Sequence, residues 1–216
     1  MGWQDGGKSA ADEQRHRPET EAKRRAILEA AVEVFGQKGS AKGTLEEVAE
    51  KAGMTRAGVL HHFGSKQRLL LETLIYRDSS DVADYSDHHM PSGLEMFRHL
   101  IKTAQMNQKR QGITRAYVTL SSESIVDGNV GYDYFRQRYA NLRQDLVNAL
   151  MDAGRLRGVE VDEKNAANTA ASILAAMDGL QLQWLLDPDE VDLSETTEYV
   201  IRSLVAQVFN PGKQIL

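Results

Sequence analysis

One short polar segment holds the residue in this chain best suited to reading a nucleic-acid base. Arg56 follows Thr55 and precedes the small pair Ala57 and Gly58. An arginine can donate two hydrogen bonds to the edge of one guanine, and small neighbours let the backbone approach the bases. The chemistry that this segment favours is direct base readout in DNA.

Three residues around this segment have the spacing of a helix-turn-helix. Ala49 is small enough for two helices to cross closely, Gly53 tolerates the positive φ of a tight turn, and Val59 supplies an apolar anchor on the second helix. In such a motif the second helix enters the DNA major groove. The spacing by itself is equally compatible with an ordinary αα-hairpin.

Phosphate contacts are expected beside the motif. Thr44 and Glu47 form a capping-box pattern, which predicts a helix beginning just after Thr44. Free N–H groups at such a helix start bind anions, and Lys66 stands at the start of the next long helix. We therefore expect Thr44 and Lys66 to hold the DNA backbone.

Apolar residues recur at spacings of three and four along nearly the whole chain, which predicts an all-α protein of about nine helices. Four short or medium helices are expected first, over about 20–38, 44–53, 55–63 and from 65 onward, with Gly39 ending the first. Longer helices are expected near 93–109, 113–126, 130–153, 163–186 and 194–209. The fourth helix would link a small N-terminal part rigidly to a larger C-terminal one.

Composition limits the class of protein. The 216 residues include no cysteine and carry a net charge of −5, which excludes disulfide scaffolds and thiol chemistry and, taken alone, argues against nucleic acid. Residues 1–77 hold 13 Lys and Arg against 11 Asp and Glu, a net of +2, whereas the remainder has 13 against 20, a net of −7. With no signal-peptide core and no bilayer-length apolar run, we expect a cytoplasmic protein without a membrane partner.

The stretch from Gly39 to Leu71 resembles the DNA-binding domain of the tetracycline-repressor (TetR) family. The resemblance rests on Ala30, Ala31, Phe35, Thr44, Val48, Ala49, Gly53, His62, Phe63 and Lys66. It departs at Leu60, where the family usually has a tyrosine, so Leu60 is assigned no DNA contact. DNA contacts are expected from Thr44, Thr55, Arg56, Ala57, Gly58, His61, His62 and Lys66. For His62, a hydrogen bond between helices is favoured over a phosphate contact.

The resemblance implies a homodimer that presents two DNA-binding domains and holds a small-molecule effector in each C-terminal domain. The expected domains are a flexible arm over 1–18, a helix-turn-helix domain over 19–66 and a ligand-binding and dimerisation domain over 67–216. The cavity is expected to be lined by Phe97, Ile101, Tyr117, Ser121, Phe135, Tyr139 and Trp184. Most of these side chains would be plain core in any helical domain.

Small residues at spacing four predict a dimer interface, because they let another helix approach closely. The expected interface residues are Ala167, Ala171, Ala175, Leu204 and Val208. The alternative is that both helices bury these faces within one chain.

No catalytic, metal or cofactor site is expected. The sequence has no Walker loop or dinucleotide fingerprint, and the serines near Ser121 lack the glycine elbow of a nucleophile. His88 and His89, with Asp84, Asp87 and His99, are interpreted as ordinary polar residues rather than as metal ligands. The leading hypothesis is a sequence-specific transcriptional repressor released from a palindromic operator by an effector. The alternative is a helical small-molecule or protein-binding module that does not bind DNA.

Overall fold

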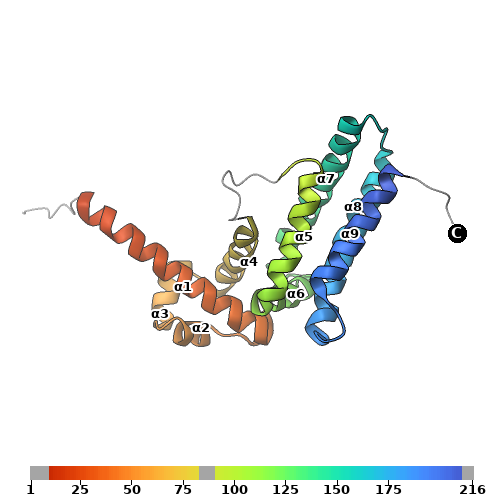
Figure 1. Ribbon diagram of the computed structural model, residues 1–216. Coiled ribbons are helices and arrows are strands. Elements are labelled where there is room, and N and C mark those ends of the chain that lie inside the picture. The colour runs from red at the N-terminus through yellow and green to blue at the C-terminus, as the bar shows by residue number, and fades with distance from the viewer. Residues whose placement is uncertain (1–9, 83–90, 211–216) are drawn as a thin grey trace, which may run out of the picture.

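The computed structural model describes residues 10–82 and 91–210, with side chains described over 19–78 and 91–210. Every regular element in these ranges is a helix, as the sequence predicts (Figure 1). The helices are α1 (Ala10–Lys42), α2 (Leu45–Lys51), α3 (Arg56–Phe63), α4 (Lys66–Val82), α5 (Leu94–Lys109), α6 (Gln111–Glu123), α7 (Tyr132–Arg157), α8 (Glu163–Leu186) and α9 (Leu193–Phe209). His88 and His89 lie outside the described residues.

The first helix is longer than its apolar pattern predicts. α1 begins at Ala10 rather than near Thr20, because residues 10–17 are mostly strong helix formers that need no buried face to continue the helix. The expected flexible arm over 1–18 is therefore helical from Ala10 onward, and residues 1–9 lie outside the described part. At the other end Gly39 adopts a φ of 74°, which interrupts the regular helix at the predicted stop.

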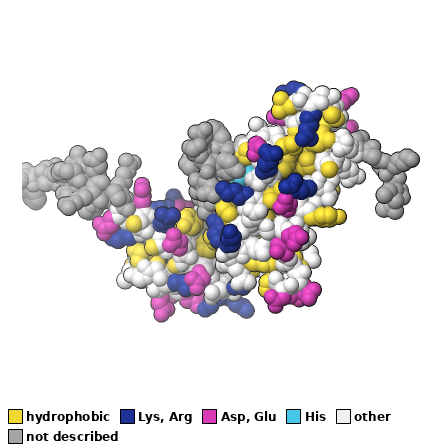
Figure 2. All heavy atoms as spheres, in the orientation of Figure 1, with side chains coloured by type: hydrophobic (Ala, Val, Ile, Leu, Met, Phe, Trp, Pro, Cys, Tyr) yellow, Lys and Arg dark blue, Asp and Glu magenta, His cyan; other side chains and the backbone are white. Residues whose placement is uncertain are grey.

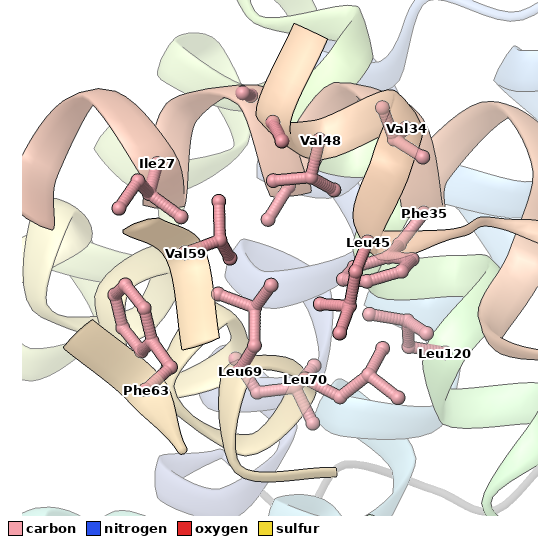
Figure 3. Close-up of a cluster of buried hydrophobic side chains, with 14 of the residues drawn as sticks. Ile27, Val34, Phe35, Leu45, Val48, Val59, Phe63, Leu69, Leu70 and Leu120 are labelled. Atoms are coloured by element: carbon pink, nitrogen blue, oxygen red, sulfur yellow. The ribbon is translucent and has the colours of Figure 1, made fainter. Parts of the chain in front are cut away.

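The first four helices enclose a shared apolar core (Figure 3). Phe35 of α1, Val48 of α2 and Val59 of α3 have at most 2% of their surface exposed, and Phe63 and Leu69 pack against them. Burying a side chain of this size contributes about 1.5–3 kcal/mol. The same cluster includes Tyr117, Leu120 and Phe135 from α6 and α7, so the core of the small helices continues into the long ones.

A second apolar core joins α5, α7, α8 and α9, which lie side by side as long helices in Figure 1. Met96, Leu150, Ile173 and Ile201, one from each helix, are at most 1% exposed. No helix in the described ranges is both long and apolar enough to cross a membrane.

α1 and α6 cross at unusually close range. A Cβ added to Gly36 would lie 3.0–3.1 Å from the backbone and side chain of Ala116, so only glycine fits this crossing without displacement. At the kink, the amide N–H of Ser40 donates to Oε2 of Glu123 at 2.8 Å. These contacts fasten α1 to the C-terminal bundle at a place separate from α4.

Candidate nucleic-acid interface and internal cavity

The turn between α2 and α3 has the geometry that its three marker residues predict. Ala49 is 3% exposed, Val59 is fully buried, and Gly53 has a φ of 64°. The backbone N–H of Met54 donates to the carbonyl of Ala49 at 2.8 Å, which closes the turn. The two short helices therefore pack as a helix-turn-helix, with the start of α3 presented to solvent.

The start of α3 is capped, and its first turn includes small side chains. The Thr55 hydroxyl accepts a hydrogen bond from the N–H of Gly58 at 3.1 Å, so it satisfies one free donor of the helix start. Arg56 and Ala57 are exposed. A Cβ on Gly58 would meet Met54 and Thr55 only at 3.4 Å, an ordinary contact distance. Internal packing therefore does not require glycine here.

Arg56 forms an ion pair with a neighbouring helix in the DNA-free chain. Its Nε lies 2.7 Å from Oε1 of Glu46 on α2, and both side chains are more than half exposed. Ion pairs this exposed contribute about 0–1 kcal/mol. Arg56 can therefore leave Glu46 for a guanine at little energetic cost.

The start of α2 carries the predicted capping box. The Thr44 hydroxyl accepts from the N–H of Glu47 at 3.2 Å, and the Glu47 carboxylate accepts from the N–H of Thr44 at 3.0 Å. The hydrogen bond from Lys38, with the one from Thr44, lowers the pKa of Glu47. Thr44 is exposed, but its hydroxyl and its N–H are already hydrogen-bonded to Glu47. A phosphate bound at this helix start would have to share these two groups with Glu47.

The end of α3 meets α1 through backbone rather than through an imidazole. Nη1 of Arg24 donates to the carbonyl of His62 at 2.6 Å. Burial, together with the positive charges of His61 and Arg24, lowers the pKa of the His62 imidazole. His61 is exposed, whereas Leu60 packs against the core.

Lys66 lies beside the end of α1. Its Nζ is 3.5 Å from the carbonyl of Ala41, and the contact is exposed. Figure 2 shows that Lys and Arg are interspersed with Asp and Glu over the region of α1 to α3. The surface is therefore of mixed charge, so orientation must come from individual contacts rather than from one basic face.

Arg24 is an organising residue that the sequence patterns did not indicate. Its guanidinium lies 4.4 Å from the centre of the Phe63 ring and pairs with Glu72 of α4. One side chain thereby joins α1, the end of α3 and α4. Its partners are 38 and 48 residues away along the chain, a separation that gives no local signal.

A cavity of about 240 Å³ lies inside the C-terminal bundle, bounded by α4 to α8. Leu100, Leu142, Leu174 and Met177 form its apolar walls. Its polar lining consists of Arg77, Asp78, His99, Thr103, Asn107, Tyr117, Arg138, Tyr139, Asn141, Asp145, Asp178 and Gln181. A concave space with apolar walls and convergent polar groups is typical of a small-molecule site, and here the polar lining is unusually large.

A charged cluster fastens the C-terminal part of α4 to α7 at the cavity wall. The Asp78 carboxylate lies 2.7 Å from Nε of Arg138 and 2.8 Å from Nη1 of Arg77, and it accepts from the Tyr134 hydroxyl. Burial disfavours the charged carboxylate, but Arg138 and Arg77 outweigh this and lower the pKa of Asp78. Arg77 also lies over the Tyr117 ring, 4.2 Å from its centre.

A second carboxylate faces two tyrosines. The Tyr139 hydroxyl donates to Oδ2 of Asp178 at 2.5 Å, and the Tyr117 hydroxyl donates to Oδ1 at 3.3 Å. Burial raises the pKa of Asp178 and also those of the two phenols. This cluster joins α6, α7 and α8 across one end of the cavity.

The structure brings two of the seven expected cavity residues, Tyr117 and Tyr139, to this site. Phe97 and Ile101 instead line a separate groove between α5 and α9. Ser121 donates to the carbonyl of Val118 within its own helix. Phe135 and Trp184 are buried at 5% exposure and fill core space rather than bound the cavity.

The polar residues of α5 that line the cavity were not predicted, although the sequence contains a signal for them. His99, Thr103 and Asn107 recur every four residues within an otherwise apolar helix face. All three are at least 93% buried. Polar residues at helical spacing on a buried face mark either a hydrogen-bond network or a ligand site.

The expected dimer residues divide into two groups. Ala167, Ala171 and Ala175 are exposed along one face of α8, as an unpaired stripe would be. Leu204 is half-buried, whereas Val208 is only 4% exposed and packs inside its own chain. Leu182, Leu186 and Tyr199 are large apolar or aromatic residues of α8 and α9 that are at least 48% exposed.

Comparisons with known proteins agree with this architecture. Residues 27–73 match the family model described as bacterial regulatory proteins of the tetR family, and residues 94–210 match the C-terminal model of BetI-type transcriptional repressors. The HTH-type transcriptional regulator TtgR of Pseudomonas putida is 29% identical over 191 residues, covering 83% of this chain and 88% of TtgR.

Solved structures share the fold. The TetR regulator TylP of Streptomyces fradiae has a TM-score of 0.70 and 23% identity, covering 88% of each chain. SmeT, the repressor of the Stenotrophomonas maltophilia multidrug efflux pump SmeDEF, has a TM-score of 0.67 and 19% identity. That alignment covers 90% of this chain and 96% of SmeT.

Proposed function

We propose that this chain, which belongs to the TetR family of bacterial transcriptional regulators, is a cytoplasmic repressor that a small-molecule effector releases from a palindromic operator. The observation that carries the proposal is that a single helix reaches both sites. Arg77 and Asp78 of α4 form part of the cavity wall, while Glu72 pairs with Arg24, which holds the end of α3.

The release step follows from this connection. Glu72 and Asp78 are six residues apart, so the two contact points are separated by about 9 Å along α4. A ligand that displaces the Asp78 end would shift the Glu72 end and, through Arg24, the recognition helix. The ligand can do this only by binding one arrangement more tightly than the other, with a coupling of about 1–3 kcal/mol.

A homodimer completes the proposal. Two recognition helices must lie about 34 Å apart to enter successive major grooves of a palindrome. The exposed alanine stripe of α8, with Leu182 and Tyr199, offers a self-complementary surface for a second copy. Each subunit would then present one α3.

Selection of bound DNA from a random pool tests the proposal. The expected result is a palindromic sequence whose affinity falls as salt rises. Arg56→Ala should weaken operator binding by about 1–3 kcal/mol, or about 5- to 150-fold, and relax preference at one base pair. Absence of any enriched sequence and of any salt-dependent retention would instead favour a binding module that does not contact DNA.

A further inference from the structure

Besides Nε of Arg77 and Nδ1 of His99, three buried side chains that carry no charge present hydrogen-bonding groups in the cavity that the described residues do not use. Asn107 is fully buried, Gln181 is 4% exposed and Thr103 is 7% exposed. Neither amide atom of Asn107 makes a hydrogen bond within the described residues, nor do the Thr103 hydroxyl and Oε1 of Gln181. Buried polar atoms normally have partners, because an unsatisfied one has lost its hydrogen bonds to water without replacement.

These groups come from two facing helices and line the same cavity. Thr103 and Asn107 lie one turn apart on α5, and Gln181 comes from α8. Together they offer both donors and acceptors, the complement of a carboxamide, hydroxyl or carbonyl group. None of the three carries a charge, so this end of the cavity offers no counter-ion.

At the other end of the cavity, the arginine and aspartate side chains already pair with one another or with tyrosines. The Arg138 and Arg77 guanidiniums both contact Asp78, and Asp178 accepts from Tyr139 and Tyr117. An anionic ligand would also meet the carboxylates of Asp178 and Asp145. The three carboxylates of the lining, against two arginines already paired with one of them, therefore disfavour an anion.

A permanent cation lacks an open face of Tyr117 in this cavity. Such ligands are bound by open aromatic faces. Here the guanidinium carbons of Arg77 and Arg138 lie 4.2 and 5.0 Å from the centre of the Tyr117 ring. The arginines occupy the aromatic surface and would repel a second cation.

We propose that the effector is a compact uncharged molecule whose apolar body lies against Leu100, Leu174 and Met177 and whose amide or phenolic group pairs with Asn107, Thr103 and Gln181. This inference rests on the proposed function, since it takes the cavity as the effector site. A volume of about 240 Å³ is below the usual range of about 300–1,000 Å³, so the molecule must be small.

The proposal makes an unusual prediction for the ligand-free protein. Asn107→Leu replaces an unsatisfied amide by an apolar side chain of similar size, so it should raise Tm by about 2–6 °C. A structural asparagine would give the opposite sign. Thr103→Val, which removes one hydroxyl while keeping the shape, is the second variant should Asn107→Leu fold poorly.

The experiment is a thermal-shift titration with four probes of similar size: benzamide, 4-hydroxybenzamide, benzoate and tetraethylammonium. The two uncharged probes should raise Tm of the wild-type protein. Asn107→Leu or Thr103→Val should weaken this response at least tenfold. The matched control is Asn148→Leu, because Asn148 is an exposed asparagine of α7 bonded only to Gln144 in the described structure, and it should respond like wild type.

Two results would overturn the proposal: larger shifts with benzoate or tetraethylammonium, or no shift with either uncharged probe. Loss of stability in both cavity variants would also contradict it. Operator retention is measured in parallel on the wild type. A protein that binds the selected DNA but ignores uncharged probes refutes the ligand class alone, whereas a protein that binds no DNA refutes the proposed function.

Discussion

Neutralising Asp78 tests how firmly α4 is fastened to the C-terminal bundle. Asp78→Asn keeps the size of the side chain but removes the negative charge between Arg138 and Arg77, whose side chains are 19% and 4% exposed. Removing one member of a buried ion pair costs about 3–5 kcal/mol, because the other charge remains buried and unpaired. The Asp78 side chain is 27% exposed, so we expect a smaller loss of about 2–4 kcal/mol.

Chemical denaturation at a fixed protein concentration measures this loss. Thermal unfolding should show the same loss as a fall in Tm of about 4–16 °C. The matched control is Asp152→Asn, which removes an exposed carboxylate 2.9 Å from Arg155 on the surface of α7. Its loss should stay below about 0.5 kcal/mol.

The pH dependence gives the same experiment a second readout. Asp78 has a folded-state pKa below its ordinary value of 3.8, so its contribution to stability is complete above that value and is lost as pH falls through the lower folded pKa. The gap between wild type and Asp78→Asn should therefore be full at pH 7 and shrink under acidic conditions. A loss below about 1 kcal/mol at pH 7, or a gap that does not shrink, would refute the role assigned to this cluster.

Three further substitutions test other parts of the structure. Gly36→Ala should destabilise the fold by about 1–3 kcal/mol in denaturation, because the new methyl group meets the α6 backbone, whereas Gly112→Ala has open space and should stabilise it by about 0.5–1 kcal/mol; equal effects would contradict the close crossing. Gly58→Ala should leave the unfolding transition intact yet weaken operator binding several-fold in gel-shift titrations, and unchanged affinity would mean that α3 does not approach the bases this closely. Ala171→Glu should convert the dimer to a monomer in sedimentation velocity and abolish tight operator binding, so a persistent dimer would place the interface elsewhere.

The fold was predictable wherever its signals are local. Thr44 and Thr55 cap the short helices, and Gly53 adopts the positive φ of the turn, because each depends only on residues within a few positions. The ion pair between Asp78 and Arg138 was not predictable, since the two residues are 60 positions apart and meet only after α4 and α7 pack.

The cavity shows a different limit of sequence reasoning. Of the large aromatic residues expected to line it, Tyr117 and Tyr139 do so, whereas Phe135 and Trp184 are buried at 5% exposure because large apolar side chains fill space most effectively. The rest of the lining includes medium-sized polar residues such as Thr103 and Asn107. Their spacing of four on an apolar face was visible in the sequence, but the unsatisfied amide of Asn107 that gives it meaning appears only in three dimensions.

The α1–α6 crossing gives the proposed release step a second connection between the cavity and the helix-turn-helix, in addition to α4. Tyr117 borders the cavity, and its neighbour Ala116 touches α1 at Gly36. A ligand that moves Tyr117 must move α6, and at a contact of about 3 Å α1 has no room to stay in place. Because Glu123 also holds the kink of α1, displacement of α6 would carry the first helix of the DNA-binding unit while α4 carries the third. In the proposed dimer, two attachments that move together would carry α3 as part of a rigid unit and so change the spacing of the recognition helices without unfolding either helix.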